Sequence, residues 1–139
     1  MHYAELISRS NRTDHAWWAT AVSVALNSPG VGGRNKNTYR LGSVLTNKRR
    51  LYTARHNSYK THPLLIKFTD YPYLHAESAA IFAQGIKKCE NLSLYTVRLM
   101  RNGHIAPAHP CEACRAIMKL AGLESAFVST YEGFEMILL

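Results

Sequence analysis

The chain is poor in cysteine and has no long apolar run, and each shortage excludes a class of protein. Its 139 residues include three cysteines. This small, odd number argues against a disulfide framework. No apolar run is long enough to span a bilayer, and no basic segment followed by an apolar one opens the chain as a leader would. We therefore expect a soluble, cytoplasmic protein without a membrane partner.

Acidic residues are also scarce, and their shortage leaves a strongly basic chain. Nine Asp and Glu face seventeen Lys and Arg, which gives a formal net charge of +8. A basic balance favours anionic partners such as nucleotides, RNA or DNA, although it also serves ordinary solubility. The basic residues are scattered, and no aromatic-interleaved nucleic-acid motif accompanies them. The charge therefore leaves a nucleic-acid partner possible without requiring one.

The order of expected elements predicts an α/β fold. No repeat, low-complexity tract or linker divides the chain, so we expect a single domain over residues 1–139. We predict helices at 14–26, 74–88 and 111–120, and strands at 41–46, 50–55, 92–100, 125–130 and 134–139. Three residues separate the last two strands, which permits an antiparallel return and no crossover helix. The pattern predicts a mixed five-stranded sheet with helices packed on its faces.

Three features indicate a metal site when they are taken together: His75-Ala76-Glu77, Pro110-Cys111 and Cys114. Two cysteines three residues apart at the start of a helix lie on one face, so both sulfurs can point at one ion. His75, at the start of another helix, can supply a third ligand. Three nitrogen and sulfur ligands suit a catalytic zinc, which keeps one position open for water. Glu77 is close enough to exchange protons with that water.

These motifs resemble the zinc signature of the cytidine deaminase-like superfamily. The resemblance implies a three-layer α/β/α fold, with zinc held by His75, Cys111 and Cys114 and protons carried by Glu77. It also implies hydrolytic deamination of a cytosine nucleoside or nucleotide to the uracil form, with release of ammonia. Members commonly assemble as homo-oligomers, so we expect the same of this chain.

The same resemblance implies contacts with the substrate. It assigns the backbone of Ala76 to the pyrimidine and the side chain of Asn57 to the sugar. Tyr73 lies just before the helix that begins near His75, where its ring can stack on a pyrimidine or simply pack. The long stretch between Asn57 and His75 is basic, and its Lys60, His62 and Lys67 can contact a phosphate or solvent, as can Arg101 and His104.

Other interpretations remain open at this stage. His109 or His104 can in principle complete a closed, structural zinc site with four protein ligands. A redox Cys-x-x-Cys pair needs neither the histidine nor the glutamate. Among enzymes, the alternative substrate is a base in RNA or single-stranded DNA, including tRNA adenosine. A zinc-stabilised binding module without catalysis is a further alternative.

Overall fold

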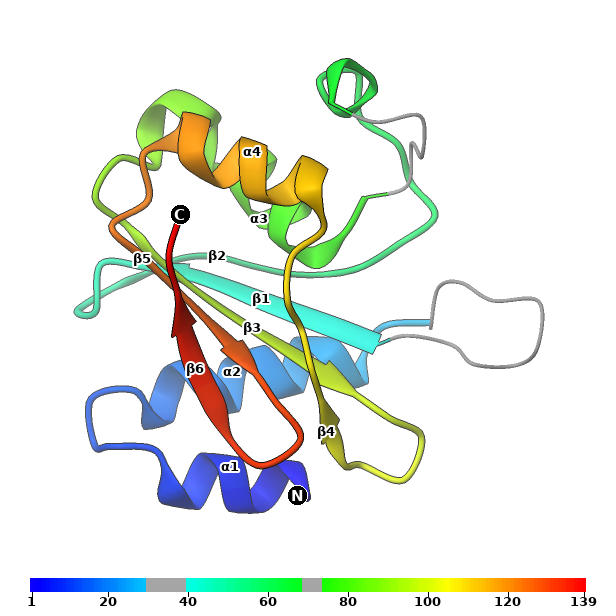
Figure 1. Ribbon diagram of the computed structural model, residues 1–139, viewed down its shortest axis with the longest axis vertical. Helices are drawn as coiled ribbons and strands as arrows, with labels where there is room; N and C mark the ends of the chain where they lie inside the picture. The colour runs from blue at the N-terminus through cyan, green and yellow to red at the C-terminus, as the bar shows by residue number, and fades with distance from the viewer. Residues whose placement is uncertain (30–39, 69–73) are drawn as a thin grey trace.

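The computed structural model describes residues 1–29, 40–68 and 74–139, which fold around a mixed sheet (Figure 1). Its α-helices are α1 (Tyr3–Arg9), α2 (His15–Leu26), α3 (Ala76–Gln84) and α4 (Glu112–Ala121). Its strands are β1 (Arg40–Thr46), β2 (Leu51–His56), β3 (Ser93–Leu99), β4 (Ile105–Ala106), β5 (Ser125–Ser129) and β6 (Phe134–Ile137). Two short 3-10 helices are η1 (Leu65–Lys67) and η2 (Ile86–Lys88).

The sheet has the strand order β2-β1-β3-β5-β6, with β4 paired to the end of β3. Strands β3 and β5 are parallel, whereas the other neighbouring strands are antiparallel. The mixed sheet and the antiparallel return of its last two strands confirm the prediction. The predicted number of five strands is wrong by one, because β4 falls in a segment that we expected to be a loop. Two residues are too few to show the alternation that marks a strand.

The helices form a layer on each face of the sheet. Helices α3 and α4 cover one face, and α1 and α2 cover the other (Figure 1). This arrangement confirms the expected three-layer α/β/α architecture. A hydrophobic core lies on each side, with Ile81, Leu94 and Ile117 on the α3/α4 face. Trp18 and Tyr95 are fully buried on the α1/α2 face, where their rings meet edge to face.

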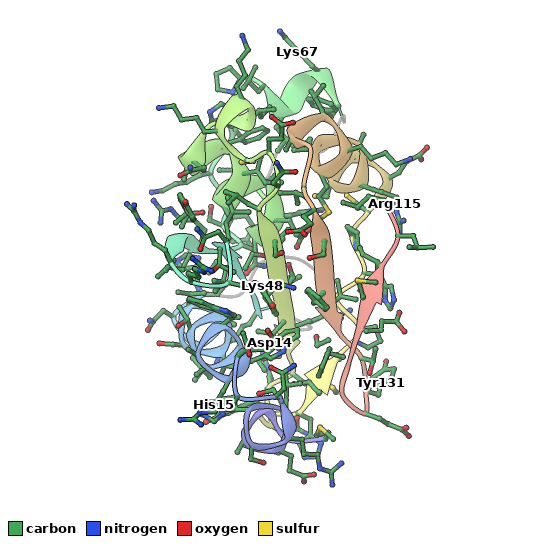
Figure 2. The ribbon with its side chains drawn as sticks, turned by 90° about the vertical axis from the view of Figure 1, so that its left-hand side faces the viewer. Asp14, His15, Lys48, Lys67, Arg115 and Tyr131 are labelled. Carbon is green, nitrogen blue, oxygen red and sulfur yellow. The ribbon has the colours of Figure 1, made fainter. Side chains whose placement is uncertain are left out.

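Helix α2 lies directly against β1 because Gly42 has no side chain. A Cβ atom at this position would come within 2.0 Å of the backbone oxygen of Ala21. Close to this contact, the Tyr95 hydroxyl donates a buried 2.7 Å hydrogen bond to Asp14, which lies at the start of α2 (Figure 2). These contacts fix α2 on the sheet.

The helix boundaries differ from the prediction in ways that local chemistry explains. Helix α1 was not predicted, because its seven residues bury only Leu6 and show no clear apolar periodicity. The helix predicted at 74–88 divides into α3 and η2 at Gly85, whose φ of 96° no α-helix adopts. Among the described residues, no helix combines the length and apolar character needed to cross a bilayer.

Candidate metal centre

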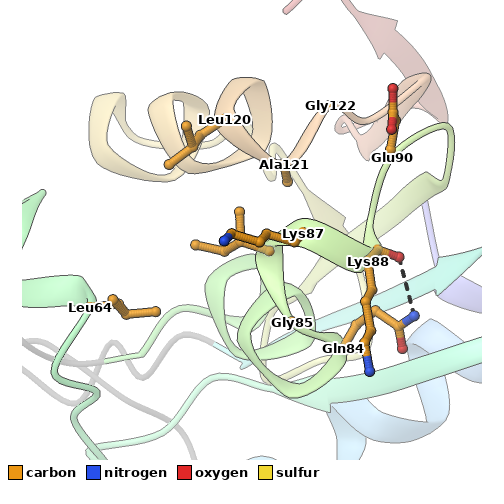
Figure 3. A pocket seen from close by; sticks show the side chains of 10 residues that line it. Leu64, Gln84, Gly85, Lys87, Lys88, Glu90, Leu120, Ala121 and Gly122 are labelled. Atoms are coloured by element: carbon orange, nitrogen blue, oxygen red, sulfur yellow. Dashed lines mark hydrogen bonds between the residues drawn. The ribbon is translucent and has the colours of Figure 1, made fainter.

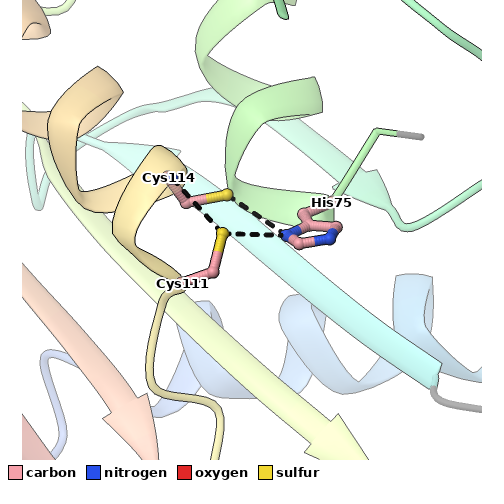
Figure 4. Close-up of side chains that lie close together, drawn as sticks. All are labelled: His75, Cys111 and Cys114. Carbon is pink, nitrogen blue, oxygen red and sulfur yellow. Dashed lines mark hydrogen bonds between the residues drawn. The ribbon is translucent and has the colours of Figure 1, made fainter. Parts of the chain in front are cut away.

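His75, Cys111 and Cys114 converge at one point between α3 and α4 (Figure 4). Their ligand atoms all lie within 4.8 Å of one another. The Nδ1 atom of His75 is 3.6 Å from the Cys111 sulfur and 3.3 Å from the Cys114 sulfur. Both sulfurs therefore face the same ring nitrogen, and these three groups can hold one metal ion.

The topology brings residues that are 36 positions apart to the same edge of the sheet. Helix α3 leads into β3 and helix α4 leads into β5, and these two strands are parallel. Both helices lie on one face, so both begin over the carboxyl ends of the strands, where α/β proteins bind ligands. His75 is the N-cap of α3, and Cys111 is the N-cap of α4. The Cys111 sulfur accepts a 3.5 Å hydrogen bond from the backbone N–H of Cys114, which fixes the sulfur at the helix start.

The hydrogen bonds among the three groups favour a thiolate at Cys111. Hydrogen bonds with the Cys114 thiol and then with the His75 ring lower the pKa of Cys111 to about 3. The same hydrogen bond with Cys111, helped by burial, raises the pKa of Cys114. Hydrogen bonding to Cys111 raises the pKa of His75, while burial opposes this shift. A metal ion that bound here would displace the protons of these hydrogen bonds, because its ligands must be thiolates and a neutral imidazole.

The chemistry of these donors fits zinc. One imidazole nitrogen and two sulfurs are the ligands that zinc prefers, and three of them leave a coordination position for water. In the part of the chain that the structure describes, this group contains no fourth protein ligand. The two histidines considered as a fourth ligand are not part of this group. The His109 ring is hydrogen-bonded to Glu135, and His104 pairs with His2 through an isolated backbone β-bridge.

Glu77 lies beside this group and is almost entirely enclosed by protein. Its side chain is 2% exposed, and its Oε1 atom has no hydrogen-bond partner among the described residues. Burial raises the pKa of Glu77, and the nearby positive charge of His75 opposes the rise. A buried polar atom without a partner is rare in folded proteins and often marks a catalytic role. A buried carboxylate with one unpartnered oxygen therefore lies beside His75, Cys111 and Cys114.

A small pocket opens onto the metal group and Glu77. Its volume is about 260 Å³, close to the lower end of small-molecule sites, which range from roughly 300 to 1,000 Å³. The described residues that line it are Leu41, His75, Glu77, Arg98, Pro107, Ala108, His109 and Cys111. The carboxylate, two of the three metal-binding side chains and Arg98 therefore share one cavity.

A larger groove of about 810 Å³ lies at the other ends of the same helices (Figure 3). It runs between η2 and the end of α4, and its lining is mainly apolar. Lys87, Lys88 and Glu90 are its charged residues, and none of the metal-binding side chains reaches it. The candidate metal site therefore rests on the chemistry of the donors and not on the volume of the cavity.

The structure describes two of the three residues that we expected to contact substrate, Ala76 and Asn57. Ala76 is fully buried in the first turn of α3, next to His75. Asn57 is 3% exposed, and its Oδ1 accepts hydrogen bonds from the Ser28 hydroxyl (2.7 Å) and the Leu41 backbone N–H (3.0 Å). Tyr73 lies outside the described residues. The amide of Asn57 is thus held in one orientation beside Leu41, which lines the pocket.

The basic stretch after Asn57 does not gather around the pocket. Lys60 and Lys67 are exposed, and Figure 2 shows Lys67 at the outside of the molecule. The His62 ring stacks on Phe82 at 4.5 Å between ring centroids. None of these three residues lines the pocket of the metal group as far as the structure describes it.

Arg98 is the pocket residue that sequence reasoning missed. It lies in β3, whose other residues are apolar or small and polar. The signal was present, because a lone arginine interrupts an otherwise buried strand near its carboxyl end. Residues at that end of a strand commonly face a ligand in α/β proteins.

Comparison with known proteins identifies the fold. No family model and no curated protein matches the chain. Among solved structures, the cytidine deaminase from Mycobacterium leprae superposes with a TM-score of 0.55 and 21% sequence identity. The match covers 91% of this chain and 94% of that enzyme. The chain therefore has the cytidine deaminase-like fold, as its motifs predict.

Proposed function

We propose that the protein is a zinc-dependent deaminase that converts a cytosine nucleoside or nucleotide to the uracil form and releases ammonia. One observation carries this proposal: a nitrogen-and-sulfur ligand set and a buried carboxylate meet in a single pocket. The likeness in fold to a cytidine deaminase supports it. A purely structural metal site would have no use for a carboxylate with an unpartnered oxygen.

His75, Cys111 and Cys114 would hold the zinc ion. When bound, zinc supplies a Lewis acid that lowers the pKa of a water molecule toward neutrality. The thiolate character of Cys111 and the fixed Nδ1 of His75 prepare the site for such an ion. Their positions at two helix N-termini add favourable dipoles for the negatively charged sulfurs.

Glu77 would carry the protons of the reaction. Its carboxylate takes a proton from water and delivers it to the ring nitrogen, while the water oxygen forms a bond with the amine-bearing carbon. The proton of the hydroxyl group now on that carbon passes through the same carboxylate to the amine. A C=O bond forms as the C–N bond breaks, and ammonia leaves. The raised pKa of Glu77 makes it a stronger base than an exposed glutamate, which suits it to this work near neutral pH.

The substrate contacts assigned to Ala76, Asn57 and Tyr73 also belong to this proposal. The fixed amide of Asn57 supports a directional contact with a sugar hydroxyl, because its Oδ1 is already held by Ser28 and Leu41. The cytoplasmic location, the single-domain organisation and the homo-oligomeric state stay predictions from the sequence.

One observation favours a second candidate, deamination of a base within RNA or single-stranded DNA. The chain carries a net charge of +8, which suits a polyanionic partner. Such an enzyme binds its strand in an extended basic groove. Binding that weakens steeply with salt would favour this candidate over the free nucleotide.

A substrate panel tests the proposal directly. The zinc-loaded protein is incubated with cytidine, deoxycytidine, their mono- and triphosphates, adenosine and short single strands, and released ammonia is measured. We expect turnover of a cytosine monomer and one zinc ion per chain by elemental analysis. Zinc binding without turnover of any member would favour a non-catalytic zinc-stabilised module instead.

A further inference from the structure

Four residues from neighbouring strands line up across one end of the sheet. Leu41 of β1 pairs with Arg98 of β3, and Arg98 pairs with Ala106 of β4. On the other side, the backbone N–H of Asn57 donates a 3.2 Å hydrogen bond to the oxygen of Leu41 and continues the row just beyond β2. Residues directly opposite each other in a sheet project to the same face.

This row lies on the face that carries the metal group. Leu41 packs against the hydrophobic core beneath α3 and α4. In β3, Val97 and Leu99 on either side of Arg98 belong to the opposite core, beneath α1 and α2. Because side chains alternate along a strand, Arg98 projects toward α3 and α4, where it lines the pocket with His75.

Arg98 brings a permanent positive charge into the pocket. A guanidinium stays protonated in proteins, and its planar fork binds phosphate through two parallel hydrogen bonds. The side chain is half-buried, so solvent screens it less than a surface lysine. Among the described residues that line the pocket, Arg98 is the one permanent cation.

The row also has a suitable spacing for a nucleotide. Asn57 and Arg98 are two strands apart, which places their backbones roughly 10 Å from each other. Asn57 is the residue that we assign to the sugar, and Glu77 acts at the base. A phosphate joined to that sugar can extend from Asn57 across Leu41 toward Arg98.

We propose that Arg98 binds the 5′-phosphate of the substrate and makes the enzyme selective for a nucleoside monophosphate over the free nucleoside. This inference rests on the proposed deaminase function and deepens it. It assigns the selectivity to a strand residue at the pocket, rather than to Lys60, His62 or Lys67 in the basic stretch.

The test measures selectivity in the zinc-loaded protein. The kcat/KM values for CMP and dCMP are compared with those for cytidine and deoxycytidine, in the wild type and in Arg98→Gln. Loss of a charge-assisted pair with phosphate should lower the monophosphate-to-nucleoside ratio roughly 10- to 100-fold. Arg98→Lys should retain part of it. The matched control Arg101→Gln removes the same charge from an exposed loop position, and its ratio should stay within about twofold.

A binding measurement separates failure of this inference from failure of the function. Calorimetry with UMP and uridine reports on the phosphate contact whether or not any substrate is turned over. If no cytosine compound is deaminated, the proposed function fails, but UMP binding that is weakened by Arg98→Gln still supports the phosphate contact. Equal UMP affinity in wild type and variant would overturn the role of Arg98. The role of Arg98 would also be overturned if a short single strand bound more tightly than CMP and Arg98→Gln weakened binding of the strand more than binding of CMP.

Discussion

The substitution Glu77→Gln tests the chemistry of the site without changing its shape. Glutamine is close to glutamate in volume, but it cannot accept a proton. General acid–base catalysis contributes roughly 10²- to 10⁴-fold to a rate. We expect a loss in the upper part of that range, about 10³- to 10⁴-fold in kcat. In the proposed mechanism both proton transfers use this one group, and the side chain is only 2% exposed, so bulk water cannot replace it.

The assay combines ammonia release with zinc content, and it has a close internal control. Glu112→Gln removes the same charge one residue after Cys111, but Glu112 is exposed in the first turn of α4 and does not line the pocket. We expect Glu77→Gln to keep one zinc per chain and lose turnover, and Glu112→Gln to keep both within about twofold. A Glu77→Gln protein that retains more than about a tenth of wild-type kcat would refute the proton-transfer role.

The remaining predictions concern stability and metal binding. Tyr95→Phe removes a buried hydrogen bond to Asp14 and should lower the free energy of unfolding by about 1.5–3 kcal/mol. For a chain of this length, that is a drop of roughly 5–10 °C in Tm. In the same thermal melts, the control Tyr52→Phe, at a partly exposed hydroxyl, should leave Tm nearly unchanged. Burial raises the pKa of Cys89 to about 11 from 9.0, so the folded thiol keeps its proton after the unfolded thiol has lost it. The contribution of this thiol to stability in denaturant titrations should therefore fall by about 2 kcal/mol between pH 9 and 11, and Cys89→Ala should flatten that decline. Cys114→Ser should lose stoichiometric zinc in elemental analysis while Cys89→Ser keeps it, and equal zinc in both would contradict the ligand assignment.

The sequence was sufficient for the site's core because its signals are short-range and chemically specific. Cys111 and Cys114 are three residues apart on one predicted helix, so their spacing alone indicates a shared direction. Glu77 is two residues from His75, which keeps it close to the expected metal position. The convergence of His75 and Cys111 across 36 positions was inferred from the ligand chemistry of zinc and is seen in the structure, where the parallel strands β3 and β5 bring the starts of α3 and α4 together. The roles of these residues in metal binding and catalysis stay predictions.

The elements that sequence reasoning missed depend on tertiary context. Helix α1 and strand β4 are too short for a periodic pattern, and pairing with distant residues supports them: the backbone N–H of Tyr3 donates to the oxygen of Gly103, and that of Ile105 donates to Met1. The hydrogen bond between Ser28 and Asn57 joins residues 29 positions apart, which no local pattern reveals. Arg98 was overlooked because a charge in a strand indicates an exposed position until the neighbouring strands are known.

The direct seat of α2 on Gly42 ties the two sides of the sheet together. Gly42 and Leu41 are successive residues of β1, so Gly42 contacts α2 on one face of the sheet and Leu41 forms the floor of the pocket with His75 and Glu77 on the other. Enlarging the glycine must push the helix off or bend the strand, and a bent strand displaces that floor. Sequence variation on the α2 side of the sheet is therefore constrained by the shape of this pocket as well as by folding. Substitutions at the contact between α2 and Gly42 should therefore change the depth of the pocket without altering any residue that lines it.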